Sequence, residues 1–184
     1  QKLEEMGIKI YSSSMVTSIT RDRQVTYQNQ NGFFTVSAGA IILAMGCRER
    51  SRGAIAIPGS RPAGVYTAGI AQKLVNCEGY TLGKKVFVLG SGDIGLIMAD
   101  RLKRTGADVI AVCELMPYSN GTKKNMDECL HANSIPLMLS HTVTEIHGQN
   151  RVEGVTVSAV DENLKSIKGS EQYFECDTLL LSVG

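Results

Sequence analysis

The feature that most constrains the fold is a strand-like run that is followed at once by a glycine-rich turn and a helical pattern. Residues 86–89 form a short apolar run typical of a buried strand, and Gly90-Ser91-Gly92-Asp93-Ile94-Gly95 follows directly. Residues 96–105 then carry apolar side chains at helical spacing and stop at Gly106, while a second apolar run over 107–113 ends at Glu114. This order predicts a β-α-β unit with a parallel sheet.

In that context the Gly-x-Gly-x-x-Gly spacing predicts a dinucleotide-binding turn. Gly90 would allow the tight turn, Gly92 would let the backbone approach a pyrophosphate, and Gly95 would let the helix pack closely on the strand. The helix N-terminus would supply free N–H groups and a partial positive charge for the phosphates. We therefore expect the whole turn to bind the cofactor: Gly90, Ser91, Gly92, Asp93, Ile94 and Gly95. The alternative is a purely structural glycine turn.

Glu114 indicates which nicotinamide cofactor is favoured. It lies 24 residues beyond Gly90, at the tip of the second predicted strand. A carboxylate at that place accepts hydrogen bonds from ribose hydroxyls and repels a 2′-phosphate, and residues 115–118 offer no arginine to bind one. The sequence thus predicts NAD, and NADH as its reduced form, rather than NADP. The alternative is a solvated acid at a strand end, with a basic residue approaching from the helix: Arg101, Lys103 or Arg104.

A weak internal repeat flanks this unit. Residues 3–20 align without gaps to residues 130–147, and each copy continues through polar, hairpin-like strands. In the first copy, residues 25–28 and 33–36 flank a turn-forming cluster at 29–32. Each copy closes with an apolar run, at residues 38–46 and 176–184, for which we expect a buried strand. Chance similarity between two helix–strand pieces is the alternative explanation.

Composition excludes several classes of protein. The chain has 184 residues with 19 basic and 18 acidic side chains, so its net charge of +1 provides no basic field for nucleic acid. No apolar run reaches the roughly 20 residues of a membrane span, and the N-terminus lacks a signal-peptide pattern. Five cysteines without regular spacing favour a reducing, cytoplasmic setting over a disulfide framework. The three histidines lack partners at metal-ligand spacing, so no metal site is predicted.

The layout resembles the pyridine nucleotide-disulfide oxidoreductase superfamily, flavoproteins in which an NAD(P) domain interrupts an FAD domain. Ala44-Met45-Gly46 stands where those proteins carry an Ala-Thr-Gly-like motif, with Met45 in place of the usual threonine. Residues 176–184 resemble the strand that closes the NAD domain. The resemblance covers essentially the whole chain and implies an α/β, Rossmann-like fold with a parallel sheet and an antiparallel β-meander.

The linker between the repeats resembles that of one branch of this superfamily. Residues 46–50 and 57–69 look like the linker of the amine and amino-acid oxidase branch. Within it, the charged cluster from Arg48 to Arg52 is expected to be a solvated loop, with contact to a flavin-domain partner or a phosphate as the alternative. This chain departs from the pattern of thioredoxin reductases, because its residues 67–83 contain only Cys77 and therefore no Cys-x-x-Cys redox disulfide. Many relatives carry a glutamate where this chain has Ile97.

The resemblance also implies a division of the chain. Residues 1–60 would be a partial FAD-binding segment with its linker, and residues 61–184 would be the NAD-binding domain. Val16, Gly46 and Gly184 are candidate cofactor contacts, with a purely structural role for Val16 as the alternative. The glycine-rich FAD turn and the downstream Gly-Asp motif of such flavoproteins are not in this sequence. We therefore expect an excised part of a longer protein that is inactive alone.

The resemblance implies hydride transfer between nicotinamide and flavin. The expected cofactors are NAD in this chain and FAD in the parent protein. The expected partners are NADH, the missing FAD-domain segments, and further copies or other subunits. No side chain of the chain is predicted to be catalytic. One alternative is an amine or amino-acid oxidase subunit whose dinucleotide domain is mainly structural or transfers electrons, and another is a non-enzymatic dinucleotide sensor.

Overall fold

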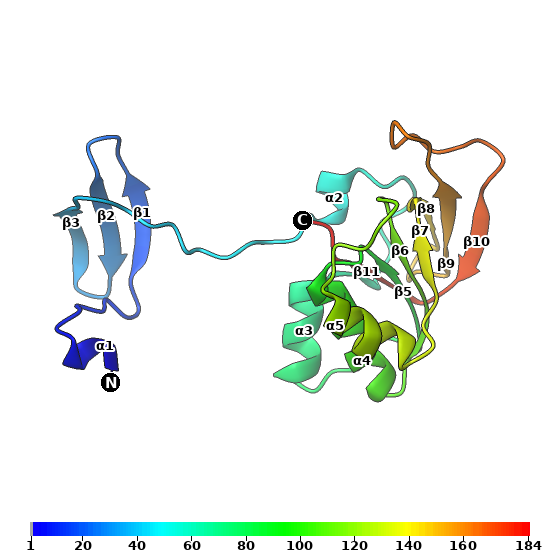
Figure 1. The fold of residues 1–184 in the computed structure, drawn as a ribbon, viewed down its shortest axis with the longest axis horizontal. Coiled ribbons are helices and arrows are strands. Elements are labelled where there is room, and N and C mark those ends of the chain that lie inside the picture. The colour runs from blue at the N-terminus through cyan, green and yellow to red at the C-terminus, as the bar shows by residue number, and fades with distance from the viewer. Residues whose placement is uncertain (1) are drawn as a thin grey trace. The chain divides into compact units, whose positions relative to one another are not determined.

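A computed structural model describes residues 2–184 and divides the chain into two compact units, residues 1–46 and residues 47–184 (Figure 1). Among the described residues, no helix has the length and apolar character needed to cross a membrane.

The first unit is a short helix followed by a three-stranded antiparallel sheet. Strand β2 is central and pairs with β1 on one side and with β3 on the other. The predicted hairpin is confirmed, because Asn29 pairs with Gly32 across a two-residue turn. No described residue of this unit is buried. Its elements are α1 (Lys2–Glu5), β1 (Met15–Ile19), β2 (Gln24–Asn29) and β3 (Gly32–Ser37).

The apolar run at residues 38–46 is not the buried strand that the sequence predicts. It is irregular and largely exposed, with Ile42 at 91% exposure. A strand requires hydrogen bonds to a neighbouring strand, and no strand of this unit pairs with residues 38–46. The equivalent run of the second repeat does form a strand, β11 (Thr178–Leu181), because it lies between two others.

The second unit holds the predicted β-α-β element and all of the buried core. Its helices are α2 (Arg52–Ile55), α3 (Ala68–Asn76), α4 (Asp93–Arg104), α5 (Lys123–Asn125) and the π-helical turn η1 (Met126–His131). Its strands besides β11 are β4 (Val65–Thr67), β5 (Lys85–Leu89), β6 (Asp108–Glu114), β7 (Leu137–Leu139), β8 (His141–His147), β9 (Gly154–Ala159) and β10 (Gln172–Glu175).

Two sheets organise this unit. The larger is fully parallel with the order β4-β11-β5-β6-β7, and the smaller is antiparallel with the order β10-β9-β8. Helices α3 and α4 cover one face of the parallel sheet, and the antiparallel sheet lies on its other face (Figure 1). The predicted α/β fold, with a parallel sheet and an antiparallel meander, is confirmed.

The side chains of β5 show how the parallel sheet is buried on both faces. Val86 and Val88 belong to the apolar cluster under the helices, whereas Phe87 and Leu89 belong to the cluster facing the antiparallel sheet. Successive residues of a strand point to opposite faces, so a strand covered on both sides reads as a continuous apolar run. This explains why the run over residues 86–89 was recognisable in the sequence.

Helix α4 ends just before Gly106, as predicted, and begins at Asp93, three residues before the apolar pattern at residues 96–105. Gly92 is its N-cap and makes no side-chain capping bond. At the other end Gly106 has a φ of +95°, and its N–H donates to the Lys103 carbonyl at 3.0 Å. A glycine in the left-handed region after the last turn is the common C-terminal cap of helices. The N-terminus of the helix lies within the glycine-rich turn, and no side chain caps it.

Candidate functional site

The candidate site lies where strands β5 and β11 end side by side. From β5 the chain runs through α4 to β6 on one side, while β11 pairs with β5 on its other side. In open parallel sheets this reversal of strand order leaves a crevice at the carboxyl ends of the strands, which is where ligands bind. Gly90 follows β5 and Ser182 follows β11 at this point.

Gly90 and Gly95 are required for the close packing of the turn. Gly90 has a φ of +103°, and a Cβ added to it would lie 2.3 Å from the Ser182 carbonyl oxygen. A Cβ on Gly95 would lie 2.5 Å from the Gly90 carbonyl oxygen and 2.9 Å from the Ser182 side chain. These positions match the tight turn and the helix–strand packing that the sequence predicts for the two residues.

Gly92 differs because open space lies in front of it. A Cβ on Gly92 would have no heavy atom within 4 Å, and its φ of −66° suits any residue. Gly92 also lines a cavity of about 440 Å³ at the N-terminus of α4. An uncapped helix N-terminus facing a cavity offers unsatisfied N–H groups to an anion. The residues present therefore fit a pyrophosphate at this place.

Glu114 is buried, and its carboxylate is already bonded to the protein. Its Oε2 accepts hydrogen bonds from the Ser91 backbone N–H at 2.9 Å and from the Ser91 hydroxyl at 2.8 Å. Its Oε1 accepts from the Met116 N–H at 3.0 Å. Glu114 thus fastens the glycine-rich turn to the tip of β6, a role that no sequence pattern indicates. A carboxylate has about four acceptor positions, so about one remains for a ligand hydroxyl.

Asp93 secures the next loop rather than facing the cavity. Its Oδ1 accepts from the Thr122 N–H at 2.7 Å, from the Asn125 amide at 2.8 Å and from the Thr122 hydroxyl at 3.1 Å. These bonds hold the pKa of the Asp93 carboxyl below its ordinary value, the Thr122 backbone bond having the largest effect. The loop after β6 is thereby tied to the start of α4, and Ser119 adds a bond to the Ser91 carbonyl at 3.0 Å.

The structure brings only part of the predicted set into the cavity lining. Gly90, Gly92, Glu114 and Gly184 line it, whereas Ser91 is buried behind it and Gly95 packs against Gly90. Asp93 and Ile94 are not among the lining residues. Val16, half exposed on β1, and Gly46, with a φ of +71°, belong to the first unit, and their cofactor contacts stay predictions.

Several lining residues were missed by sequence reasoning. The missed residues are Ile55, Leu89, Leu115, Met116, Asn120, Thr142, Ser182 and Val183. Leu115 and Met116 follow the tip of β6, and that position was a usable signal. Leu89 directly precedes Gly90, and Ser182 and Val183 directly precede Gly184, so their positions were usable signals as well. Ile55, Asn120 and Thr142 come from other parts of the chain, and no local pattern indicates them. Among the described residues, no Lys, Arg or His lines this cavity.

The described residues hold no metal-ligand cluster and no disulfide. None of their His, Cys, Asp and Glu side chains forms a group of three that could hold a metal ion. All five cysteines are free, with Cys113, Cys129 and Cys176 buried and Cys47 and Cys77 exposed. Burial raises the pKa of Cys176 to about 12 and also raises the pKa of Cys113. Thiolate chemistry is therefore disfavoured at both buried positions.

Known proteins resemble the chain in sequence and in fold. The family model of pyridine nucleotide-disulphide oxidoreductases matches residues 1–184. The mitochondrial dihydrolipoyl dehydrogenase of Caenorhabditis elegans is 35% identical over 107 residues, which are 55% of this chain and 20% of that protein. The chain thus spans about a fifth of the length of that curated relative.

Two solved structures share the fold. Thioredoxin reductase from T. acidophilum has a TM-score of 0.66 and 21% identity, over 100% of this chain and 56% of the other. A ferredoxin reductase from Rhodopseudomonas palustris has a TM-score of 0.64 and 22% identity, over 100% of this chain and 43% of the other.

Proposed function

Because the chain belongs to the pyridine nucleotide-disulphide oxidoreductase family, we propose that residues 47–184 bind NAD(H) at the carboxyl edge of the parallel sheet. The main observation behind this proposal is the open space in front of Gly92, which leaves the start of α4 accessible to a pyrophosphate. The activity proposed for the whole protein is hydride exchange between nicotinamide and FAD.

The residues of this chain would hold and orient the dinucleotide. The uncapped N–H groups of α4 would bind the pyrophosphate, and the remaining acceptor position of Glu114 would take a ribose hydroxyl. Leu115 and Met116 would shield the adenosine end of the cavity from water. The bound nicotinamide would supply the hydride chemistry, while the protein provides orientation and exclusion of water.

We also propose that the first unit is part of an FAD-binding domain whose other segments lie elsewhere in the parent protein. Its sheet buries no residue, and the apolar run that includes Ile42 and Leu43 is exposed without pairing. A segment of this composition gains stability when a neighbouring sheet covers it. Association with further copies or other subunits is proposed on the same ground.

The test is a fluorescence titration of the whole protein with NADH and NADPH. We expect tighter binding of NADH, because Glu114 repels a 2′-phosphate and no basic residue lines the cavity. Gly92→Ala should preserve folding, yet its methyl group would project where the pyrophosphate approaches. The expected loss of NADH affinity is about tenfold or more, the effect of ~1.4 kcal/mol.

Gly53→Ala is the matched control for that variant. Gly53 lies in helix α2, where a Cβ meets only the Ser51 hydroxyl oxygen at 3.9 Å, and it does not line the Gly92 cavity. Unchanged NADH affinity is expected for this control. Equal affinities of wild type and Gly92→Ala would contradict the proposed site.

A second proposal is an amine or amino-acid oxidase subunit in which the dinucleotide domain is mainly structural or electron-transferring. Two observations favour it: three protein donors already occupy Glu114, and Ile97 stands where many relatives carry a glutamate. In that case the whole protein should oxidise an amine or amino acid and reduce its flavin, while NADH fails to bind at millimolar concentration. Tight NADH binding would reject this alternative.

A further inference from the structure

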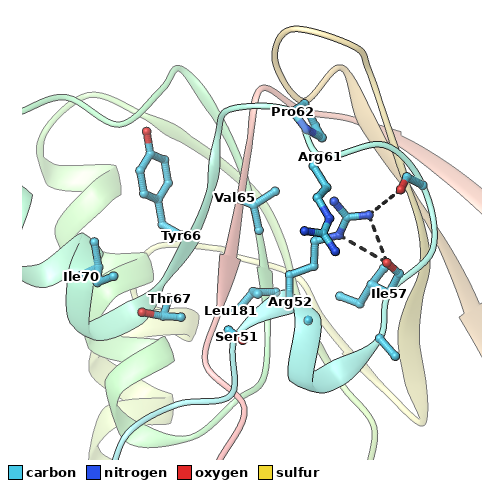
Figure 2. Close-up of a pocket in the computed structure, with 13 residues that line it drawn as sticks. Ser51, Arg52, Ile57, Arg61, Pro62, Val65, Tyr66, Thr67, Ile70 and Leu181 are labelled. Carbon is cyan, nitrogen blue, oxygen red and sulfur yellow. Dashed lines mark hydrogen bonds between the residues drawn. The ribbon is translucent and has the colours of Figure 1, made fainter.

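A larger cavity, of about 750 Å³, lies between helix α2 and strand β4 (Figure 2). Its size is within the range of small-molecule sites. The cavity is separate from the glycine-rich turn, although Leu181, the last residue of β11, lines it and the next three residues line the other cavity. The sequence did not indicate this site, because its walls come from the linker, β4 and β11.

Arg52 forms one wall, and its position is fixed by backbone carbonyls. Its Nε and Nη2 donate to the Ile57 carbonyl at 3.3 and 3.1 Å, and Nη2 also donates to the Gly59 carbonyl. The sequence favoured a solvated loop for this residue, and that expectation is wrong for Arg52, which is half-buried. Carbonyls are neutral, so the guanidinium charge is held in place without being neutralised.

Arg61 enters the same cavity from the opposite side. Figure 2 shows its side chain extending toward Arg52. Within residues 2–184, no hydrogen bond or ion pair involves the Arg61 side chain. The neighbouring Pro62 is buried and restrains the backbone from which Arg61 extends. No Asp or Glu lines the cavity, so two guanidinium charges share it without an opposing charge.

The rest of the lining is mostly apolar. Ile57 and Leu181 are buried, and Tyr66 and Ile70 stand on the α3 side of the cavity (Figure 2). Arg61 is exposed and Arg52 is half-buried. Like charges that converge repel each other, and an anion between them removes that cost. A planar guanidinium matches a carboxylate with two parallel hydrogen bonds. Apolar walls favour a ligand that carries its carboxylate on an apolar body.

We propose that this cavity binds a carboxylate attached to an apolar group, with Arg61 as the residue that contacts the carboxylate and Arg52 as a fixed second charge. The same chemistry has two possible sources: a free organic acid, or an acidic side chain from another part of the parent protein. The proposal does not depend on NAD(H) binding, since none of its residues lines the Gly92 cavity.

The test is calorimetric titration of the whole protein with 3-phenylpropionate. Its neutral amide and inorganic phosphate serve as comparison ligands. Wild type is expected to bind the carboxylate at least about tenfold more tightly than either one, because a hydrogen bond to a charged group and an apolar body both contribute. Arg61→Gln should weaken binding at least about tenfold. Arg61→Lys should weaken it less, because lysine keeps the positive charge but cannot make the two parallel hydrogen bonds of a guanidinium.

Arg48→Gln is the matched control, because Arg48 is an exposed linker arginine outside the cavity. Circular dichroism verifies folding of each variant. If wild type does not bind the probe but Arg61→Gln lowers the melting temperature and Arg48→Gln does not, the carboxylate comes from the protein itself. Probe binding unaffected by Arg61→Gln, tighter binding of phosphate than of carboxylate, or no effect in either assay would overturn the proposal.

Discussion

Gly92 and Gly95 are three residues apart in one turn, yet they meet opposite surroundings. A side-chain carbon at position 92 would enter open space, whereas at position 95 it would lie 2.5 Å from the Gly90 carbonyl oxygen. The spacing of glycines in the sequence assigned the approach of a ligand to Gly92 and helix–strand packing to Gly95, and the space around the two positions follows that division. The spacing alone could not identify the atoms that would obstruct a side-chain carbon at position 95.

We therefore predict that Gly95→Ala destabilises the fold and Gly92→Ala does not. Overpacking of a tight contact costs about 1–3 kcal/mol, and the obstructing atom at position 95 is backbone, which yields little. Urea denaturation of the two variants measures the difference in free energy of unfolding. Equal stabilities would show that the turn relaxes around the added methyl group.

Asp93 gives a prediction for the pH dependence of stability. Its carboxylate accepts three hydrogen bonds from Thr122 and Asn125, and its pKa is lowered. A carboxyl group with a lower pKa in the folded state contributes stability above its unfolded pKa of about 3.9, and this contribution is lost as the pH falls toward the folded pKa. Asp93→Asn retains an acceptor oxygen but does not titrate.

The expected result is a gap in melting temperature between wild type and Asp93→Asn that is widest near pH 7 and narrows between pH 5 and pH 3. Thermal melts at intervals across that range measure it. Asp22→Asn, on an exposed turn of the first unit, removes the same charge and serves as the control. A gap that stays constant with pH would contradict the proposed contribution of the Asp93 charge.

Among the elements, strand β5 and helix α4 were predictable and the run at residues 38–46 was not. Strand β5 is a continuous apolar run, as expected for a buried strand, and helix α4 has apolar residues at helical spacing with a glycine at each end. Residues 38–46 have an equally strong apolar pattern, but strand formation depends on a neighbour that pattern alone cannot supply. Helix α2 and strand β4 were not anticipated, because four- and three-residue elements carry too little periodicity.

The strands should differ correspondingly in hydrogen exchange. β5, β6 and β11 carry the most buried side chains of the parallel sheet, whereas β1, β2 and β3 carry no buried residue. Exchange in a strand follows the free energy of its local opening, which rises with buried apolar contacts. Mass spectrometry of peptides from residues 85–89 and 178–181 should show exchange slower by at least about a hundredfold than peptides from residues 24–37. Similar rates in both sets would mean that the antiparallel sheet of the first unit is more stable than its burial indicates.

For the whole molecule, the distribution of exposed apolar side chains distinguishes the two units. The first holds most of the large exposed hydrophobic residues, including Met6, Phe33, Ile42 and Met45, although it is a quarter of the chain. The second holds both apolar core clusters. Soluble proteins rarely leave such apolar surface uncovered, so the first unit is the part that needs a partner surface.

The resulting prediction concerns a comparison of residues 1–184 with residues 47–184. The longer chain should bind the dye ANS strongly and sediment as oligomers at micromolar concentration, because exposed apolar surface associates in water. The shorter chain keeps its three layers and should remain monomeric with little dye binding. Replacing Ile42 and Leu43 with serine in the longer chain should lower dye binding without reducing the stability of the second unit, since neither residue belongs to its core. Strong dye binding by residues 47–184 alone would instead mean that the exposed apolar surface lies in the second unit. That result would contradict the interpretation that other segments of an FAD-binding domain cover the first unit.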